Sequence, residues 1–304
     1  MRGLGTAMSR VLVFGSINMD LVVESSTFPR LGETLSGTSF ATHAGGKGAN
    51  QAVAAARLGA QVTMLGRIGS DAFGTELKAR LAAEGVATRW VQETPGASTG
   101  IAAITVCNAD NAIVVVAGAN ARLSTADLDA AESAFAEADV VLAQLEVPLA
   151  TVERGAELAA RYRKPFILNP APAARLPESL LARCTLLTPN EYELGTALAL
   201  PDVRWQELLT RLPGRVVVTK GAEGAYFTDA AGTLQHQLSF PAEPVDTTGA
   251  GDTFNGALGA FWDLGLAEAV RRGCAAGALS VTKRGAQDSM PTLAELNAFL
   301  ARGQ

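Results

Sequence analysis

The chain has 304 residues, of which 48% are hydrophobic and 18% charged, with a formal net charge of −5 and a pI near 5.2. This composition is typical of a folded globular protein and excludes a disordered or fibrous one. The acidic balance disfavours nucleic acid as the main partner, and the longest apolar stretches fall well short of the ~20 residues of a membrane helix.

Three widely spaced cysteines, Cys107, Cys184 and Cys274, form no CxxC pair, which indicates free thiols and a cytoplasmic location. The first ten residues lack the apolar core of a signal peptide. Residues 1–9 are interpreted as a loose tail in which Met8 is a second candidate start.

Short apolar runs of the kind that form buried strands recur along the chain, and segments of helical period separate most of them. The strand-like runs are residues 11–15, 62–65, 140–142, 166–168, 185–187 and 216–219. The clearest helical patterns are residues 50–58, 73–84, 149–162 and 253–264. This alternation predicts an α/β fold with a mostly parallel sheet covered by helices on both faces.

A second kind of strand pattern interrupts the first. Half-exposed, antiparallel strands are expected at residues 21–24, 34–40, 100–107 and 112–116, with a hairpin turn at 108–111. We therefore expect one domain over residues 1–304, with a small β-sheet lid formed by about 20–42 and 97–118. The exposed face of such a sheet needs covering, by a ligand or by a second copy.

The most specific stretch is 246–252, DTTGAGD, which runs directly into a helical pattern. Small residues before a helix leave unpaired N–H groups that, with the helix dipole, favour an anion. Asp252 would stand beside that anion, where it could accept a hydroxyl proton during phosphoryl transfer. The alternative is that Asp252 merely caps the helix.

Two further stretches carry polar groups suited to hydroxyls. Residues 45–52, GGKGANQA, are not a Walker A loop because no Ser or Thr follows Lys47. Their glycines permit close backbone approach, and Lys47 and Asn50 supply donors, although Lys47 could also be a solvated turn residue. Asn18 and Asp20 alternate in an extended segment and would share one face, unless this is only a polar strand exit.

In this order and spacing these stretches, together with STGIAA, VVAGAN, LNPAPA, TPNEYE, TKGAEG and KRGAQDS, resemble the ribokinase family of carbohydrate kinases over nearly the whole chain. The resemblance implies a large α/β domain with a β lid that pairs with a second subunit's lid. It also implies a catalytic base at Asp252, with Gly249 in the same catalytic loop and an anion hole formed by the backbone N–H groups of Ala250, Gly251 and Asp252.

The resemblance assigns the remaining site residues by group. Sugar binding is implied for Asn18, Asp20, Gly46, Lys47, Asn50, Glu146 and Asp252. ATP binding is implied for Asn190, Thr219, Gly221, Ala222, Gly224 and Gly251. Magnesium handling is implied for Glu193, although that side chain could equally be an ordinary first-turn carboxylate. A potassium loop site, largely of main-chain carbonyls, is implied for Asp246, Thr248, Ser280, Lys283, Gly285 and Ser289.

The first hypothesis is therefore an ATP-dependent kinase for the 5-hydroxyl of D-ribose. Fructose, deoxyribose, a sugar acid or a nucleoside such as adenosine is the alternative acceptor, and a non-catalytic sugar- or nucleotide-binding regulator is the alternative class. A Rossmann dehydrogenase is disfavoured because GSIN lacks the G-x-G-x-x-G fingerprint. Cys274 falls near the expected adenine pocket without an assigned role.

Overall fold

The computed structural model describes residues 8–108, 110–229 and 231–302, so the predicted tail of residues 1–9 lies mostly outside them. A six-stranded sheet of order β10-β9-β8-β1-β4-β5 forms the centre, and all its pairings are parallel. Its strands are β1 (Arg10–Phe14), β4 (Gln61–Gly69), β5 (Ala87–Thr94), β8 (Val140–Ala143), β9 (Phe166–Leu168) and β10 (Leu186–Leu187).

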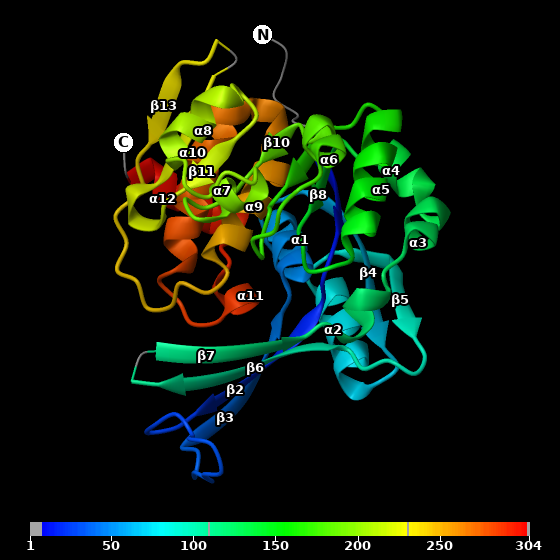
Figure 1. Cartoon of the computed structure of the whole chain (residues 1–304), viewed down its shortest axis with the longest axis vertical. Helices are drawn as coiled ribbons and strands as arrows, with labels where there is room; N and C mark the ends of the chain where they lie inside the picture. Colours follow the sequence, from blue (N-terminus) through cyan, green and yellow to red (C-terminus); the bar gives the residue numbers. More distant parts are fainter. Residues whose placement is uncertain (1–7, 109, 230, 303–304) are drawn as a thin grey trace.

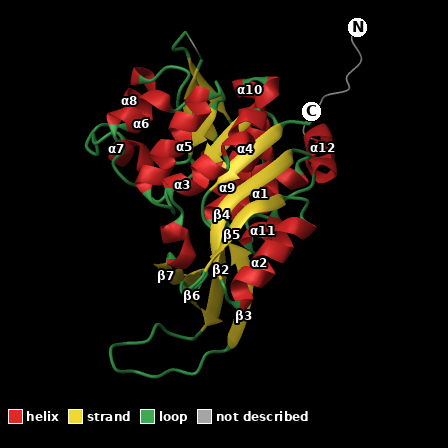
Figure 2. Cartoon of the chain, turned by 90° about the vertical axis from the view of Figure 1, so that its right-hand side faces the viewer, coloured by secondary structure: helices red, strands yellow, loops and turns green. Residues whose placement is uncertain are grey.

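Strand β1 shows how the sheet is buried on both faces. Val11 and Val13 enter one apolar cluster, whereas Leu12 and Phe14 enter another on the opposite face. Because successive strand residues point to opposite sides, each face needs its own helical layer. Figure 2 shows the two layers flanking the sheet. The predicted α/β class is confirmed.

The helices divide between these clusters. On the Val11 face lie α1 (Lys47–Arg57), α2 (Ala72–Ala83), α9 (Ala250–Ala260), α10 (Leu266–Ser280) and α12 (Leu293–Arg302). On the Leu12 face lie α3 (Thr125–Ala130), α4 (Glu132–Glu137), α5 (Leu149–Arg161), α6 (Glu178–Arg183), α7 (Glu193–Ala197) and α8 (Trp205–Arg211). Shorter helical segments are α11 (Ala286–Ser289), η1 (Gly118–Arg122), η2 (Gly221–Glu223) and η3 (Trp262–Leu264). Within the described ranges, no helix is both long and apolar enough to cross a bilayer.

A three-stranded antiparallel sheet extends the body beyond β10. It consists of β11 (Val217–Thr219), β12 (Ala225–Thr228) and β13 (Leu234–Gln237). Isolated parallel bridges, Leu187 to Val216 and Asn190 to Thr219, join it to the central sheet. The pattern at 216–219 therefore predicted strand β11 correctly. The antiparallel pairing of β11 with β12 was not predicted.

A small four-stranded sheet projects from the body (Figure 1). Its order is β3-β2-β6-β7, with β2 (Asn18–Glu24), β3 (Ser39–Gly45), β6 (Gly100–Cys107) and β7 (Asp110–Val116). The antiparallel expectation was wrong for the central pair, since β2 and β6 run parallel. Both strands start at the body and run outward, while β3 and β7 return. The strand expected at 34–40 begins instead at Ser39.

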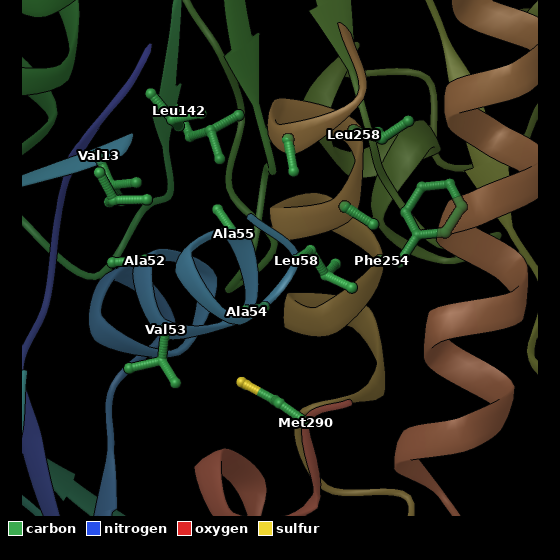
Figure 3. Packing of buried hydrophobic residues seen from close by; sticks show 14 of the residues in the cluster. Val13, Ala52, Val53, Ala54, Ala55, Leu58, Leu142, Phe254, Leu258 and Met290 are labelled. Carbon is green, nitrogen blue, oxygen red and sulfur yellow. The ribbon is translucent and has the colours of Figure 1, made fainter. Parts of the chain in front are cut away.

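Helices α1 and α9 cross very closely on the Val11 face (Figure 3). At Gly256, a Cβ atom would lie 2.5 Å from the Cβ of Ala54 and 2.8 Å from the backbone oxygen of Gln51. Only a glycine permits this approach without displacing the helices. The crossing brings the start of α1 against the first turns of α9, where the polar side chains of the site lie.

Candidate active site

Asp252 lies in the first turn of α9 and is 6% exposed. The helix begins after Gly249, which has a left-handed backbone (φ 77°) that glycine adopts at little cost. The N–H of Ala250 donates to the backbone oxygen of Thr247 (3.3 Å). It is therefore not free to bind an anion, contrary to the prediction. The N–H groups of Gly251 and Asp252 have no acceptor among the described residues and form the open helix terminus.

Two amide side chains from α1 hold the carboxylate of Asp252. Nδ2 of Asn50 donates to Oδ2 (2.9 Å), and Nε2 of Gln51 donates to Oδ1 (3.1 Å). Oδ1 of Asn50 in turn accepts from Nε2 of Gln287 (3.1 Å). Asp252 therefore does not act as a simple helix cap, because its oxygens face α1 and its own helix has no side-chain cap bond.

Polar side chains gather beside Asp252 where β2, α1 and the segment after β8 meet, and this cluster of Asp20, Lys47, Glu146 and Asp252 is called the polar pocket below. Oε2 of Glu146 accepts from Oγ of Ser16 (2.5 Å) and from the backbone N–H of Lys47 (3.1 Å). Burial raises the pKa of Asp20 to about 7, and the charges of Glu146 and Asp252 add to this shift. The carboxylate of Asp252 raises the pKa of Lys47, which therefore stays protonated. The pocket combines one ammonium group with three carboxyls.

The other predicted sugar residues complete this pocket. Asn18 precedes Asp20 by two positions on β2 and is 4% exposed. Its Oδ1 accepts from Nδ2 of Asn120 (2.7 Å), a partner that the sequence analysis missed. Gly46 caps α1 with φ 87°. The structure thus brings the predicted sugar residues together around one polar pocket.

A cavity of about 570 Å³ lies on the other side of the α9 N-terminus. Five of the predicted ATP residues line it: Thr219, Gly221, Ala222, Gly224 and Gly251. The rest of its wall is largely apolar and includes Phe254 from α9 and Cys274 from α10. Burial raises the pKa of the Cys274 thiol to about 12, so it lines the cavity as a neutral group. Ala250 and Gly251 thus separate an apolar cavity from the polar pocket.

Asn190, the sixth predicted ATP residue, does not line this cavity. It forms a reciprocal turn with Glu193: Oδ1 of Asn190 accepts from the N–H of Glu193 (2.8 Å), and Oε2 of Glu193 accepts from the N–H of Asn190 (2.9 Å). Burial raises the pKa of Glu193, the hydrogen bond from Asn190 and the charge of Lys47 lower it, and the charge of Asp252 raises it further. Glu193 is therefore near enough to Lys47 and Asp252 for their charges to act on its carboxyl.

The predicted cation loops also meet in space. The carboxylate of Asp246 accepts from the N–H groups of Thr248 and Gly285, both at 2.9 Å. Burial opposes ionisation here, but these hydrogen bonds together lower the pKa of Asp246. The side chains of Ser280 and Ser289 donate to backbone oxygens, and Lys283 pairs with Glu295. Asp246 thus joins the two loops, and the cation site predicted for them stays a prediction.

Comparison with known proteins gives the class. The pfkB family carbohydrate kinase profile matches residues 8–293, and the chain belongs to this family, as its motifs predicted. It is 43% identical over 297 residues to a ribokinase of Bacillus subtilis (strain 168), covering 97% of this chain and 100% of that protein.

Two other relatives extend this comparison. A deoxyribokinase of Salmonella typhi is 35% identical over 302 residues, which is 96% of this chain and 98% of the relative. Among solved structures, Arabidopsis thaliana ribokinase complexed with ribose and ATP gives a TM-score of 0.88 at 30% identity, covering 97% and 99% of the two chains.

Proposed function

We propose that this protein is an ATP-dependent sugar kinase that phosphorylates the 5-hydroxyl of D-ribose. The observation that carries the proposal is the position of Asp252, between a polar pocket and an apolar cavity at an open helix terminus. Hydroxyls of a sugar suit the carboxyls and amides of the pocket, and an adenine ring suits the apolar wall. The names of the relatives, ribokinases and a deoxyribokinase, support a pentose as acceptor.

The reaction follows from this arrangement. Asp252 accepts the proton of the sugar hydroxyl while its oxygen attacks the terminal phosphorus of ATP in line. The new O–P bond forms as the bond to the bridging oxygen breaks, and ADP leaves with that electron pair. The N–H groups of Gly251 and Asp252 stabilise charge on the transferring phosphoryl group.

Magnesium is proposed as the ion that accompanies ATP. Among the described residues no cluster of three or more His, Cys, Asp or Glu side chains could hold a metal alone. This fits magnesium, which keeps several waters and binds substrate phosphates with few protein ligands. Glu193, whose carboxyl is close enough to Lys47 and Asp252 for their charges to shift its pKa, would approach the ion through water. The ion would neutralise phosphate charge when bound.

We expect potassium to activate the enzyme through the loops at Asp246 and Gly285, because Asp246 fixes both loops and carbonyl oxygens suit a large monovalent cation. Steady-state ADP release should be faster in potassium than in sodium at equal ionic strength. Asp246→Ala should lose this difference, whereas Asp263→Asn on exposed η3 should keep it. Equal wild-type rates in the two salts would contradict the proposal.

The small sheet is proposed as a lid, over about residues 20–42 and 97–118, that excludes water and pairs with a second subunit. Strand β7 is an edge strand, and Ile113, Val114, Val115 and Val116 are 46–66% exposed. An exposed apolar edge of this kind favours association. We expect a homodimer in sedimentation velocity, and a monomer for Val114→Lys. A monomeric wild type at micromolar concentration would refute the lid dimer.

A cytoplasmic setting is also proposed, supported by three buried free cysteines, and neither nucleic acid nor membrane is proposed as a partner.

The function is tested by ADP release with Mg-ATP across D-ribose, 2-deoxyribose, fructose, adenosine and no sugar. Preference for ribose supports the proposal. Preference for another acceptor keeps the kinase and changes its substrate, while tight binding without turnover supports a non-catalytic regulator.

A further inference from the structure

A chain of buried amides lies behind Asp252. Nε2 of Gln144 donates to Oε1 of Gln51 (2.6 Å), and Nε2 of Gln51 donates to Oδ1 of Asp252 (3.1 Å). Gln51 is 1% exposed and Gln144 is fully buried, so both side chains lie deeper than Asp252, which is 6% exposed. The close crossing of α1 and α9 at Gly256 sets the distance between Gln51 and Asp252.

The orientation of the Gln51 amide is fixed independently of Asp252. Nδ2 of Asn169 donates to the backbone oxygen of Thr188 (2.9 Å), which can only accept. Oδ1 of Asn169 therefore faces Gln51 and accepts from its Nε2 at 3.4 Å. The Gln51 nitrogen must then point toward Asp252, and its oxygen must accept from Gln144.

The Gln144 side chain does not contribute only to the stability of the fold. Oε1 of Gln144 has no hydrogen-bond partner among the described residues. It abuts Gly15, where a Cβ atom would lie 2.1 Å from it. A buried unpaired oxygen destabilises a fold, whereas an apolar side chain of similar volume would not. This indicates that Gln144 serves the site through its donor.

We propose that Gln51, held by Gln144, is a positioning residue that keeps the carboxylate of Asp252 in the orientation in which it accepts the hydroxyl proton. A misplaced catalytic group loses turnover even where the ligands still bind. A neutral amide holds the carboxylate without the full charge of a lysine, which would make the oxygen a poorer proton acceptor. The inference rests on the proposed kinase function with Asp252 as base.

Other charged groups also face Asp252 and remain in every variant below. They are Lys47 from α1, Asp20 from β2 and Glu193 from α7. Asn50 also keeps its hydrogen bond to the second oxygen. Loss of Gln51 alone should therefore loosen the orientation of the Asp252 carboxylate without removing the base.

The test uses Gln51→Met and Gln144→Met, which conserve volume and remove the amides. We expect Gln51→Met to lower kcat roughly 10- to 100-fold, with both KM values changed less than about threefold. Gln144→Met should act in the same direction but more weakly. The double variant should be no slower than Gln51→Met, because Gln144 acts through Gln51.

Thr151→Val is the matched control, since the Thr151 hydroxyl donates to the backbone oxygen of Leu123 on the face of the sheet opposite α1 and α9. It should lower the melting temperature without lowering kcat. An unchanged kcat in Gln51→Met, equal changes in kcat and KM, or additive losses in the double variant would overturn the proposal. If Gln51→Met does not fold, Gln144→Met decides by the same loss of kcat at constant KM. If Asp252→Asn retains turnover, the proposed base fails instead.

Discussion

Asp252→Asn should bind D-ribose and Mg-ATP with near wild-type affinity and turn over roughly 10²- to 10⁴-fold more slowly, the range that a positioned general base contributes. The side chain keeps its shape but loses the ability to accept the hydroxyl proton. Binding is measured by calorimetry and turnover by ADP release. Both sugar and nucleotide contacts outside Asp252 remain in this variant, so the loss should fall on kcat.

The asparagine also lowers the stability of the fold, and the experiment must separate this loss of stability from the loss of turnover. Asn50 and Gln51 both donate to the carboxylate, and an amide offers only one acceptor oxygen. One donor therefore loses its partner, and the melting temperature should fall. Asp263→Asn, on exposed η3, is the control for the same change without this contact. Turnover within a few-fold of wild type in Asp252→Asn would show that Asp252 is not the base.

Local patterns were enough to predict the central strands and the groups that gather at their ends. In β1, the four consecutive apolar residues 11–14 predicted a strand with helices on both faces, and all four are buried. The glycines before Asp252 and Lys47 predicted the starts of two helices. A strand buried on both faces and a glycine turn before a helix each depend on neighbouring residues in the chain. Both can therefore be predicted from a single sequence.

Features that depend on distant neighbours escaped prediction. Only Val91 of β5 is fully buried, because this strand lies at the sheet edge, and its sequence lacks a continuous apolar run. Gln51 stands within a recognised motif, yet its acceptor Asp252 is 201 residues away. The sequence signal that could have marked Gln51 as a site residue is its amide in the second turn of α1, the helix that also carries Lys47 and Asn50. Its partner could not be deduced without the α1–α9 crossing.

The ionisation of Asp20 should control sugar binding near neutral pH. Burial, with the charges of Glu146 and Asp252, raises the pKa of Asp20 to about 7, so the neutral form dominates below pH 7 and the carboxylate above it. A carboxylate accepts hydroxyl hydrogen bonds more strongly than a neutral carboxyl. The kcat/KM for ribose should therefore rise as pH increases from 5.5 through 7, and level off above about pH 8.

Asp20→Asn imitates the neutral carboxyl at every pH. We expect its KM for ribose at pH 8 to be roughly 10- to 100-fold above wild type, the usual worth of a hydrogen bond to a charged group. Its KM for ATP should change little. Glu24→Gln, at the exposed end of the same strand, should behave as wild type.

The comparison across pH separates Asp20 from the catalytic base. The other titratable groups of the pocket, Lys47, Glu146 and Asp252, remain in Asp20→Asn, so any pH dependence that survives in this variant does not arise from Asp20. The variant should converge on wild type in KM for ribose as pH falls toward 5.5, since both then carry a neutral group. A constant ratio of the two KM values across this range would mean that Asp20 does not titrate between pH 5.5 and 8.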